Sequence, residues 1–217
     1  MTGPTEKGGS QKIHILKTAT SLFARKGYAA TGVREIAREA DVNLAMINYY
    51  FDSKAGLLKA IIMDFFSNYK IMLDEMFNQD HPPQTLEDVI GSFVPKLVKL
   101  CRENRDQVRV TMTELPIEIP EIADFKANQL TDVLGTILPQ MIPIAEKESS
   151  LPLRKEILGP ALAGMVIFHF LHQPVIEKLF GVTTDDAFYE DLSKTIVHVY
   201  LNGVRDHKFL PNKEGEK

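Results

Sequence analysis

Residue types that carry enzyme or metal chemistry are sparse in this sequence. His169 and His172 lie three residues apart in an apolar run and could share one helical face as a pair of metal ligands. No acid cluster completes that pair, so ordinary core or interface histidines are the favoured interpretation. Cys101 is the single cysteine, which excludes an internal disulfide and is most simply read as a small buried hydrophobe. Because the sequence has no paired acid and nucleophile and no glycine-rich phosphate loop, we expect no enzyme, no metal and no cofactor.

The most distinctive chemical feature is a run of three aromatic residues, Tyr49, Tyr50 and Phe51, followed closely by Lys54. A helix cannot turn three consecutive residues inward, so their roles must differ. Ile47 and Phe51 are four residues apart and share the face that we expect to pack on the preceding helices. The opposite face carries small, polar and aromatic groups: Ala45, Asn48 and Tyr49, with Leu44 and Met46 at its margins.

Such an outer face suits a helix that lies in the major groove of DNA. Small groups permit close approach, and apolar atoms can meet thymine methyls. Tyrosine hydroxyls, a lysine at the start of the next helix and free amides at helix N-termini suit phosphate oxygens. We therefore expect Phe51 to anchor the helix, Tyr49 to reach the groove and Tyr50 to reach the DNA backbone.

The surrounding sequence predicts the short helices needed to position that face. A first helix ends at Lys26-Gly27, and a second over residues 33–40 is capped by either Thr31 or Gly32. After a turn at Asp41-Val42, Asn43 can cap a third helix that runs to about residue 51. Asp52-Ser53 can then cap a fourth helix from about 54 to 77. Two short helices joined by a tight turn and braced by a preceding helix are typical of a helix-turn-helix.

Helical periodicity continues through the rest of the chain, which predicts an all-α protein. After a break at residues 81–83, five further helices are expected, over about 85–103, 106–118, 121–147, 154–178 and 186–207. The most apolar run, 157–171, is about fifteen residues long, short of the roughly 20 that a membrane span needs. We read it as a buried helix, expect no membrane partner, and place the protein in the cytoplasm.

The charge of the chain is divided unevenly along its length. Residues 1–59 hold nine Lys/Arg against five Asp/Glu, a net of +4, whereas residues 60–217 carry a net of −8. The first part can approach a polyanion, and the remainder would repel one.

The segment ILKTATSLFARKGYAATGVREIAREADVNLAMINYYFDSKAGLL resembles the DNA-binding domain of the TetR family of bacterial transcriptional regulators. The resemblance covers about residues 11–60, and the total length and long helices that follow are also similar. It implies contacts with DNA bases from Arg34, Leu44, Ala45, Met46 and Tyr49. It implies contacts with phosphates from Thr31, Asn43, Asn48, Tyr50 and Lys54.

The resemblance and the helical pattern together suggest how the chain is divided. We expect a disordered tail at 1–10, the helix-turn-helix DNA-binding domain at 11–54, a helical regulatory and dimerisation domain at 55–210, and a second tail at 211–217. One recognition helix touches few base pairs, so a homodimer on a palindromic operator of double-stranded DNA is expected. Its surface should be the helices at 154–178 and 186–207, because the run 157–171 is apolar all round.

The expected activity is that of a repressor released when a small-molecule effector of unknown identity binds the helical domain. Apolar, sulfur-containing and ionisable side chains at helical spacing are candidates for lining the effector site; they are Met72, Phe93, Met112, Glu114, Phe125, Met165 and His169. An activator and a regulator without an effector remain open, as do an enzyme with a site hidden in the C-terminal region and a DNA-anchored module that recruits a partner protein.

Overall fold

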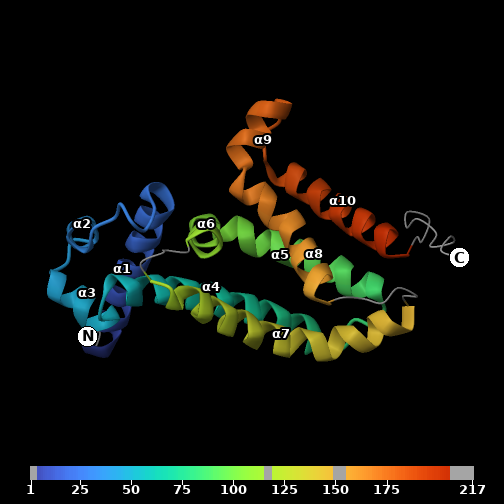
Figure 1. Cartoon of the computed structure of the whole chain (residues 1–217), viewed down its shortest axis with the longest axis horizontal. Helices are drawn as coiled ribbons and strands as arrows, with labels where there is room; N and C mark the ends of the chain where they lie inside the picture. The colour runs from blue at the N-terminus through green and yellow to red at the C-terminus, as the bar shows by residue number, and fades with distance from the viewer. Residues whose placement is uncertain (1–3, 115–118, 149–154, 206–217) are drawn as a thin grey trace, which may run out of the picture. The chain divides into compact units, whose positions relative to one another are not determined.

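The computed structural model describes residues 4–114, 119–148 and 155–205, and within them every regular element is an α-helix. The helices are α1 (Pro4–Lys26), α2 (Val33–Glu39), α3 (Leu44–Phe51), α4 (Lys54–Phe77), α5 (Leu86–Glu103), α6 (Arg105–Thr113), α7 (Glu121–Glu148), α8 (Lys155–Leu171), α9 (Gln173–Phe180) and α10 (Asp186–Arg205). Figure 1 shows them in chain order. The all-α prediction is confirmed for this part of the chain.

The chain forms two compact units, each built from two stretches of sequence. The first unit comprises the chain up to Ile71 together with Glu103–Leu134, and the second comprises Met72–Arg102 together with the chain from Gly135 onward. The first unit therefore contains more than the three N-terminal helices, because α6 packs on α1. The boundary predicted between residues 54 and 55 stays a prediction.

Helices α1, α2 and α3 gather at one end of the first unit as a helix-turn-helix (Figure 1). Gly27, with a positive φ of 82°, ends α1, and its N–H donates to the Phe23 carbonyl at 2.8 Å. The turn between α2 and α3 is closed by the Val42 N–H, which donates to the Ala37 carbonyl at 3.0 Å. Ile15, Ile36 and Ile47, one from each helix, are fully buried and form the core of this domain.

The start of α4 is packed tightly against the end of α3. The Ser53 hydroxyl accepts the Gly56 N–H at 3.0 Å, which confirms the predicted cap. An added Cβ at Gly56 would lie 1.9 Å from the Phe51 carbonyl oxygen, so only glycine fits there. From α6, the buried Gln107 side chain donates to the Ile61 carbonyl at 3.3 Å and to the Asp64 carboxylate at 2.7 Å. These bonds fix α6 to α4 within the first unit.

Two predictions about helix limits are wrong. Residues 4–10, expected within a disordered tail, form the first turns of α1, which begins at a proline whose fixed φ is compatible with a helix start. The single helix expected over 154–178 is two helices, α8 and α9, bent by 73° after Leu171. Pro174 lies in the first turn of α9, where its missing N–H and its ring prevent continuation from α8.

The remaining predicted helices agree with the structure to within a few residues. Helix α6 ends at Thr113, and residues 115–118 lie outside the described ones, as do 149–154 and the C-terminal tail from 206 onward. Pro95, Pro139, Pro143 and Pro160 lie inside helices without ending them. Among the described residues, no single helix is long and apolar enough to cross a membrane, whereas the bent pair of α8 and α9 meets that test by length and composition.

Candidate nucleic-acid interface

Helix α3 separates into the two faces that the sequence predicts. Ile47 is fully buried and Phe51 is only 6% exposed, so this side of the helix belongs to the core. On the other side Ala45 and Asn48 are exposed, and the Tyr49 side chain is 79% exposed. Leu44 and Met46 are partly exposed at the margins. A large exposed ring beside small and polar groups forms a surface that a DNA groove could accept.

The N-terminus of α3 is fixed by its own cap. The Asn43 side-chain oxygen accepts the Ala45 N–H at 2.9 Å, as predicted. The Asn43 side chain remains exposed. The turn before it requires Asp41 at a φ of 49°, a conformation that aspartate tolerates better than most residues. The exposed residues of α3 are therefore held on a short helix with a fixed beginning.

Tyr50 contacts the rings on either side of it in α3 and lies against the first part of α1. The Tyr49 and Tyr50 rings meet edge-on with centroids 5.1 Å apart, and Tyr50 lies 6.3 Å from Phe51. The Tyr50 hydroxyl lies beside Gly8, at 3.4 Å from where a Cβ would stand. Tyr50 is thus half-buried between α1 and α3, while Tyr49 is directed to solvent.

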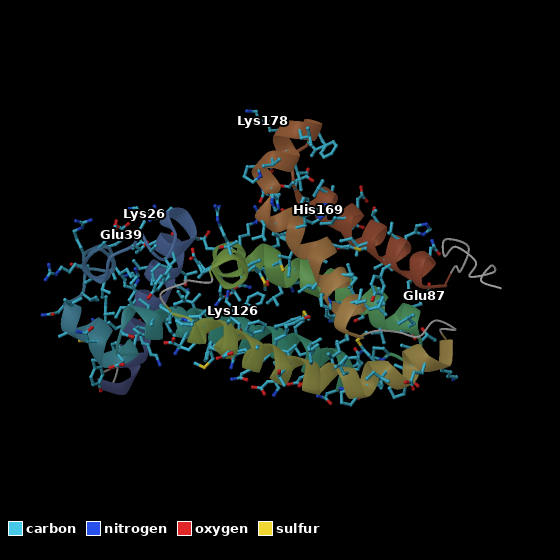
Figure 2. All side chains as sticks on the ribbon, in the orientation of Figure 1. Lys26, Glu39, Glu87, Lys126, His169 and Lys178 are labelled. Carbon is cyan, nitrogen blue, oxygen red and sulfur yellow. The ribbon has the colours of Figure 1, made fainter. Side chains whose placement is uncertain are left out.

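Helix α2 carries two exposed arginines, Arg34 and Arg38, and its two acids pair with cations at the end of α1. Arg34, the second residue of α2, is exposed. Lys26 donates a hydrogen bond to Glu35, which lowers the pKa of that carboxyl group. Figure 2 labels Lys26 at the end of α1 and Glu39 at the end of α2, and Glu39 lies 3.9 Å from Arg25. Arg34 is therefore placed where a cation could meet DNA.

Thr31 does not have the role that we expected for it. Its side chain is 1% exposed, and its hydroxyl donates to the Gly27 carbonyl at 2.8 Å. Gly32, and not Thr31, occupies the N-cap position of α2, so no side chain caps this helix. A hydroxyl that is buried and bonded within its own turn is unavailable to a phosphate, so Thr31 is removed from the candidate contacts.

Lys54 lies at the start of α4, against the turn between α1 and α2. Its ammonium is 4.1 Å from the centre of the Tyr28 ring and 3.5 Å from the Ala29 carbonyl oxygen. The side chain is partly exposed. Tyr28 itself is 5% exposed and packs on Phe23 with centroids 5.4 Å apart. Local periodicity did not predict a role for Tyr28; an aromatic residue directly after a helix-ending glycine is the signal that could have found it.

The seven candidates for an effector site are divided between the two units. Met112, Glu114 and Phe125 belong to the first unit, and Met72, Phe93, Met165 and His169 to the second. The structure brings Met165 and His169 together in one groove. The Glu114 carboxylate accepts the Tyr28 N–H at 3.2 Å within the first unit. For the other residues the role remains a prediction.

The groove that contains Met165 and His169 lies between α8 and α10 and is open and apolar. It has a volume of about 440 Å³, and its lining consists of Gly164, Met165, Phe168, His169, Leu192, Thr195, Ile196 and Val199. The His169 Nδ1 donates a hydrogen bond to the Met165 carbonyl at 2.8 Å, and Figure 2 labels His169, which belongs to α8. Phe168 and Val199 are 53% and 51% exposed, so this face presents large apolar groups to solvent.

Comparison with known proteins agrees with this geometry. Residues 15–61 match the family model described as bacterial regulatory proteins, tetR family. The chain is 26% identical to the "Probable HTH-type transcriptional regulator YttP" of Bacillus subtilis, over 90% of this chain and 94% of that protein. It is 22% identical to IcaR of Staphylococcus aureus, a negative transcriptional regulator of the biofilm operon icaADBC, over 88% of this chain and 98% of that one.

A solved structure shares the fold of nearly the whole chain. The transcriptional regulator FadR of Bacillus subtilis, solved in complex with stearoyl-CoA, superposes with a TM-score of 0.68 and 17% identity. The match covers 88% of this chain and 98% of FadR. The helix-turn-helix and the larger set of helices that follows it are therefore a known combination.

Proposed function

We propose that this chain, a member of the TetR family of bacterial transcriptional regulators, is a repressor that binds a palindromic operator as a homodimer and is released by a small-molecule effector. The observation that carries the proposal is the exposed face of α3, where Tyr49 is 79% exposed over a core of buried Ile47 and Phe51. A short helix with its inner face fixed and its outer face free of large charged groups suits the major groove.

The proposed contacts with DNA follow from the positions of the exposed and partly exposed side chains. Those offered to bases are Arg34, Leu44, Ala45, Met46 and Tyr49, and those offered to phosphates are Asn43, Asn48, Tyr50 and Lys54. Phosphate contacts fix the register of the protein on the duplex, and base contacts give sequence preference. Variants of the two groups should therefore behave differently in binding experiments.

The proposed dimer surface is the open groove between α8 and α10. Phe168 and Val199 are more than half exposed there, and Met165 is 36% exposed. Covering these groups with the same helices of a second copy would bury apolar area, which favours association. Two copies would present two recognition helices, as a palindromic operator requires. Phe168→Glu should shift the protein to a monomer in analytical ultracentrifugation and weaken operator binding; a dimer of unchanged affinity would contradict this surface.

The repressor and effector parts of the proposal draw on the relatives. IcaR is a negative regulator, and FadR was solved with stearoyl-CoA. An effector that prefers the DNA-free state must weaken DNA binding by the ratio of its two affinities. A long-chain acyl-CoA is the first probe to add, and dissociation of the protein from its operator is the expected result. Tighter DNA binding with that probe would contradict release by this class of effector.

Selection of bound sequences from random duplex DNA tests the proposed function. We expect recovery of a palindromic site whose affinity falls in Lys54→Ala, and falls less in Tyr50→Phe because the ring is retained. Lys59→Ala is a matched control, since Lys59 is paired with Glu121 at 3.9 Å within the first unit. Absence of any enriched sequence at low salt would overturn the proposal.

A further inference from the structure

The turn between α1 and α2 is held by a residue that lies 86 positions further along the chain. One Glu114 carboxylate oxygen accepts the Tyr28 N–H at 3.2 Å. The positive φ of Gly27 directs the chain around this point, and a Cβ at Gly27 would be 3.7 Å from the same oxygen. The carboxylate therefore rests directly on the Gly27-Tyr28 peptide, inside the first unit.

Glu114 is itself fixed at the end of α6. Its N–H donates to the Val110 carbonyl at 3.1 Å, which caps the helix. Its own carbonyl accepts a hydrogen bond from the Lys126 ammonium of α7, and Lys126 is labelled in Figure 2. Burial lowers the pKa of Lys126, while the nearby Glu114 carboxylate acts in the opposite direction. With its backbone held from two sides, Glu114 can hold Tyr28 in turn.

Tyr28 and the residue after it contact the Lys54 side chain. The Tyr28 ring is buried, and the Lys54 ammonium lies 4.1 Å from its centre. The Ala29 carbonyl of the same turn lies 3.5 Å from that ammonium. A ring face and a carbonyl oxygen both attract a cation, so together they determine where the ammonium of this otherwise flexible side chain lies.

We propose that Glu114 is a positioning residue for DNA binding, which holds the Tyr28 peptide so that the Tyr28 ring and the Ala29 carbonyl place the Lys54 ammonium for a DNA phosphate. Glu114 touches no DNA in this arrangement and acts through the turn. The inference rests on the proposed function, because it names the residue that holds Lys54 in place for its proposed contact with a phosphate.

The charge of Glu114 alone predicts the opposite effect of its removal on DNA affinity. A carboxylate in a DNA-binding unit repels phosphates, so removing it should strengthen binding to any duplex. If Glu114 positions Lys54, removing it should weaken binding. The sign of the change therefore distinguishes the two roles.

The experiment compares operator affinity among three variants of the full chain. In Glu114→Ala the Tyr28 N–H loses its acceptor, and we expect affinity to fall by about fivefold to tenfold. Glu114→Gln keeps an acceptor oxygen and should stay within about twofold of the wild type. Asp106→Ala removes an exposed carboxylate from the first turn of the same helix and should bind as tightly as the wild type or more tightly. Glu114→Ala with unchanged or increased affinity would overturn the proposal, as would Glu114→Gln binding as weakly as Glu114→Ala.

A double-variant comparison tests the route through Lys54. If Glu114 acts by placing that ammonium, Glu114→Ala should cause no further loss in a Lys54→Ala background. Independent, additive losses would overturn the route. Should Glu114→Ala fail to fold, Tyr28→Leu keeps the N–H and removes the ring, and we expect it to weaken operator binding; unchanged binding by a folded Tyr28→Leu would also overturn it.

The result separates this inference from the proposed function. If the wild type selects no sequence, the proposed function fails. If the wild type selects an operator and Lys54→Ala weakens binding while Glu114→Ala does not, the proposed function stands and only the role of Glu114 is rejected.

Discussion

Replacing Phe51 and Tyr49, two rings on opposite faces of α3, by alanine should give opposite phenotypes. Phe51 is 6% exposed, whereas Tyr49 is 79% exposed on the other side of the same helix. Loss of a buried phenylalanine leaves a cavity and removes transfer free energy, which together cost about 3–5 kcal/mol. Because the free energy of unfolding of a typical domain is only about 5–15 kcal/mol, Phe51→Ala should unfold the helix-turn-helix under mild conditions.

Tyr49→Ala should leave the fold intact and weaken binding to DNA. The stabilising contact that it loses is the edge-on approach to Tyr50 at 5.1 Å, worth under about 1 kcal/mol at an exposed position. If its ring reaches the groove, operator affinity should fall by about tenfold.

Urea denaturation followed by circular dichroism measures the first effect, and fluorescence anisotropy with a labelled operator measures the second. We expect Tyr49→Ala to unfold at the same urea concentration as the wild type, and Phe51→Ala to unfold at a much lower one. Equal destabilisation by the two variants would place Tyr49 in the core and refute the division of α3 into an anchoring and a presenting face.

Three further predictions concern local features. Asn43→Ala should cost about 1 kcal/mol of unfolding free energy because the Ala45 N–H loses its acceptor, whereas Asn43→Asp should cost only a few tenths; urea midpoints compare them. Burial raises the pKa of Cys101 to about 12, so a thiol reagent at pH 8 should label the native protein far more slowly than the urea-unfolded one. The hydrogen bond from Lys26 lowers the pKa of Glu35 below its usual 4.5. Its stabilising contribution is thus present above pH 4.5 and lost as the pH falls through the lowered value, so the melting-temperature difference between wild type and Glu35→Gln should disappear in acid.

Local signals predicted the helix-turn-helix well. Gly27 ends α1, Asn43 caps α3, and Ser53 caps the start of α4. Each depends on residues within three or four positions of one another, which is the range that capping and turn preferences describe. The burial of Ile47 and Phe51 follows from the same short-range periodicity.

The wrong predictions come from interactions between distant residues or from features that look alike in sequence. Pro174 ends the path of α8, yet Pro160 lies inside that helix without breaking it. Apolar periodicity continues across the break, so it did not indicate two helices. The contact between Glu114 and Tyr28 joins two turns far apart in the chain, and no pattern of spacing encodes it. The prediction for Thr31 was wrong because a threonine before a helix can either cap that helix or bury its hydroxyl in the preceding turn, and the sequence looks the same in both cases.

We propose that the exposed face of α3 reads the DNA sequence, while Lys54 at the start of α4 binds the phosphate backbone of the DNA. The most direct test of this division of roles is to select bound DNA sequences with the wild type, Tyr49→Ala and Lys54→Ala. The affinity of each protein for the selected site is then measured at several salt concentrations. We expect Tyr49→Ala to change the preferred bases at particular positions in each half-site. Lys54→Ala should keep the same preferred sequence, weaken binding to all sequences, and reduce the slope of log affinity against log salt by about 1. Unaltered base preference in Tyr49→Ala, together with altered preference in Lys54→Ala, would contradict the account.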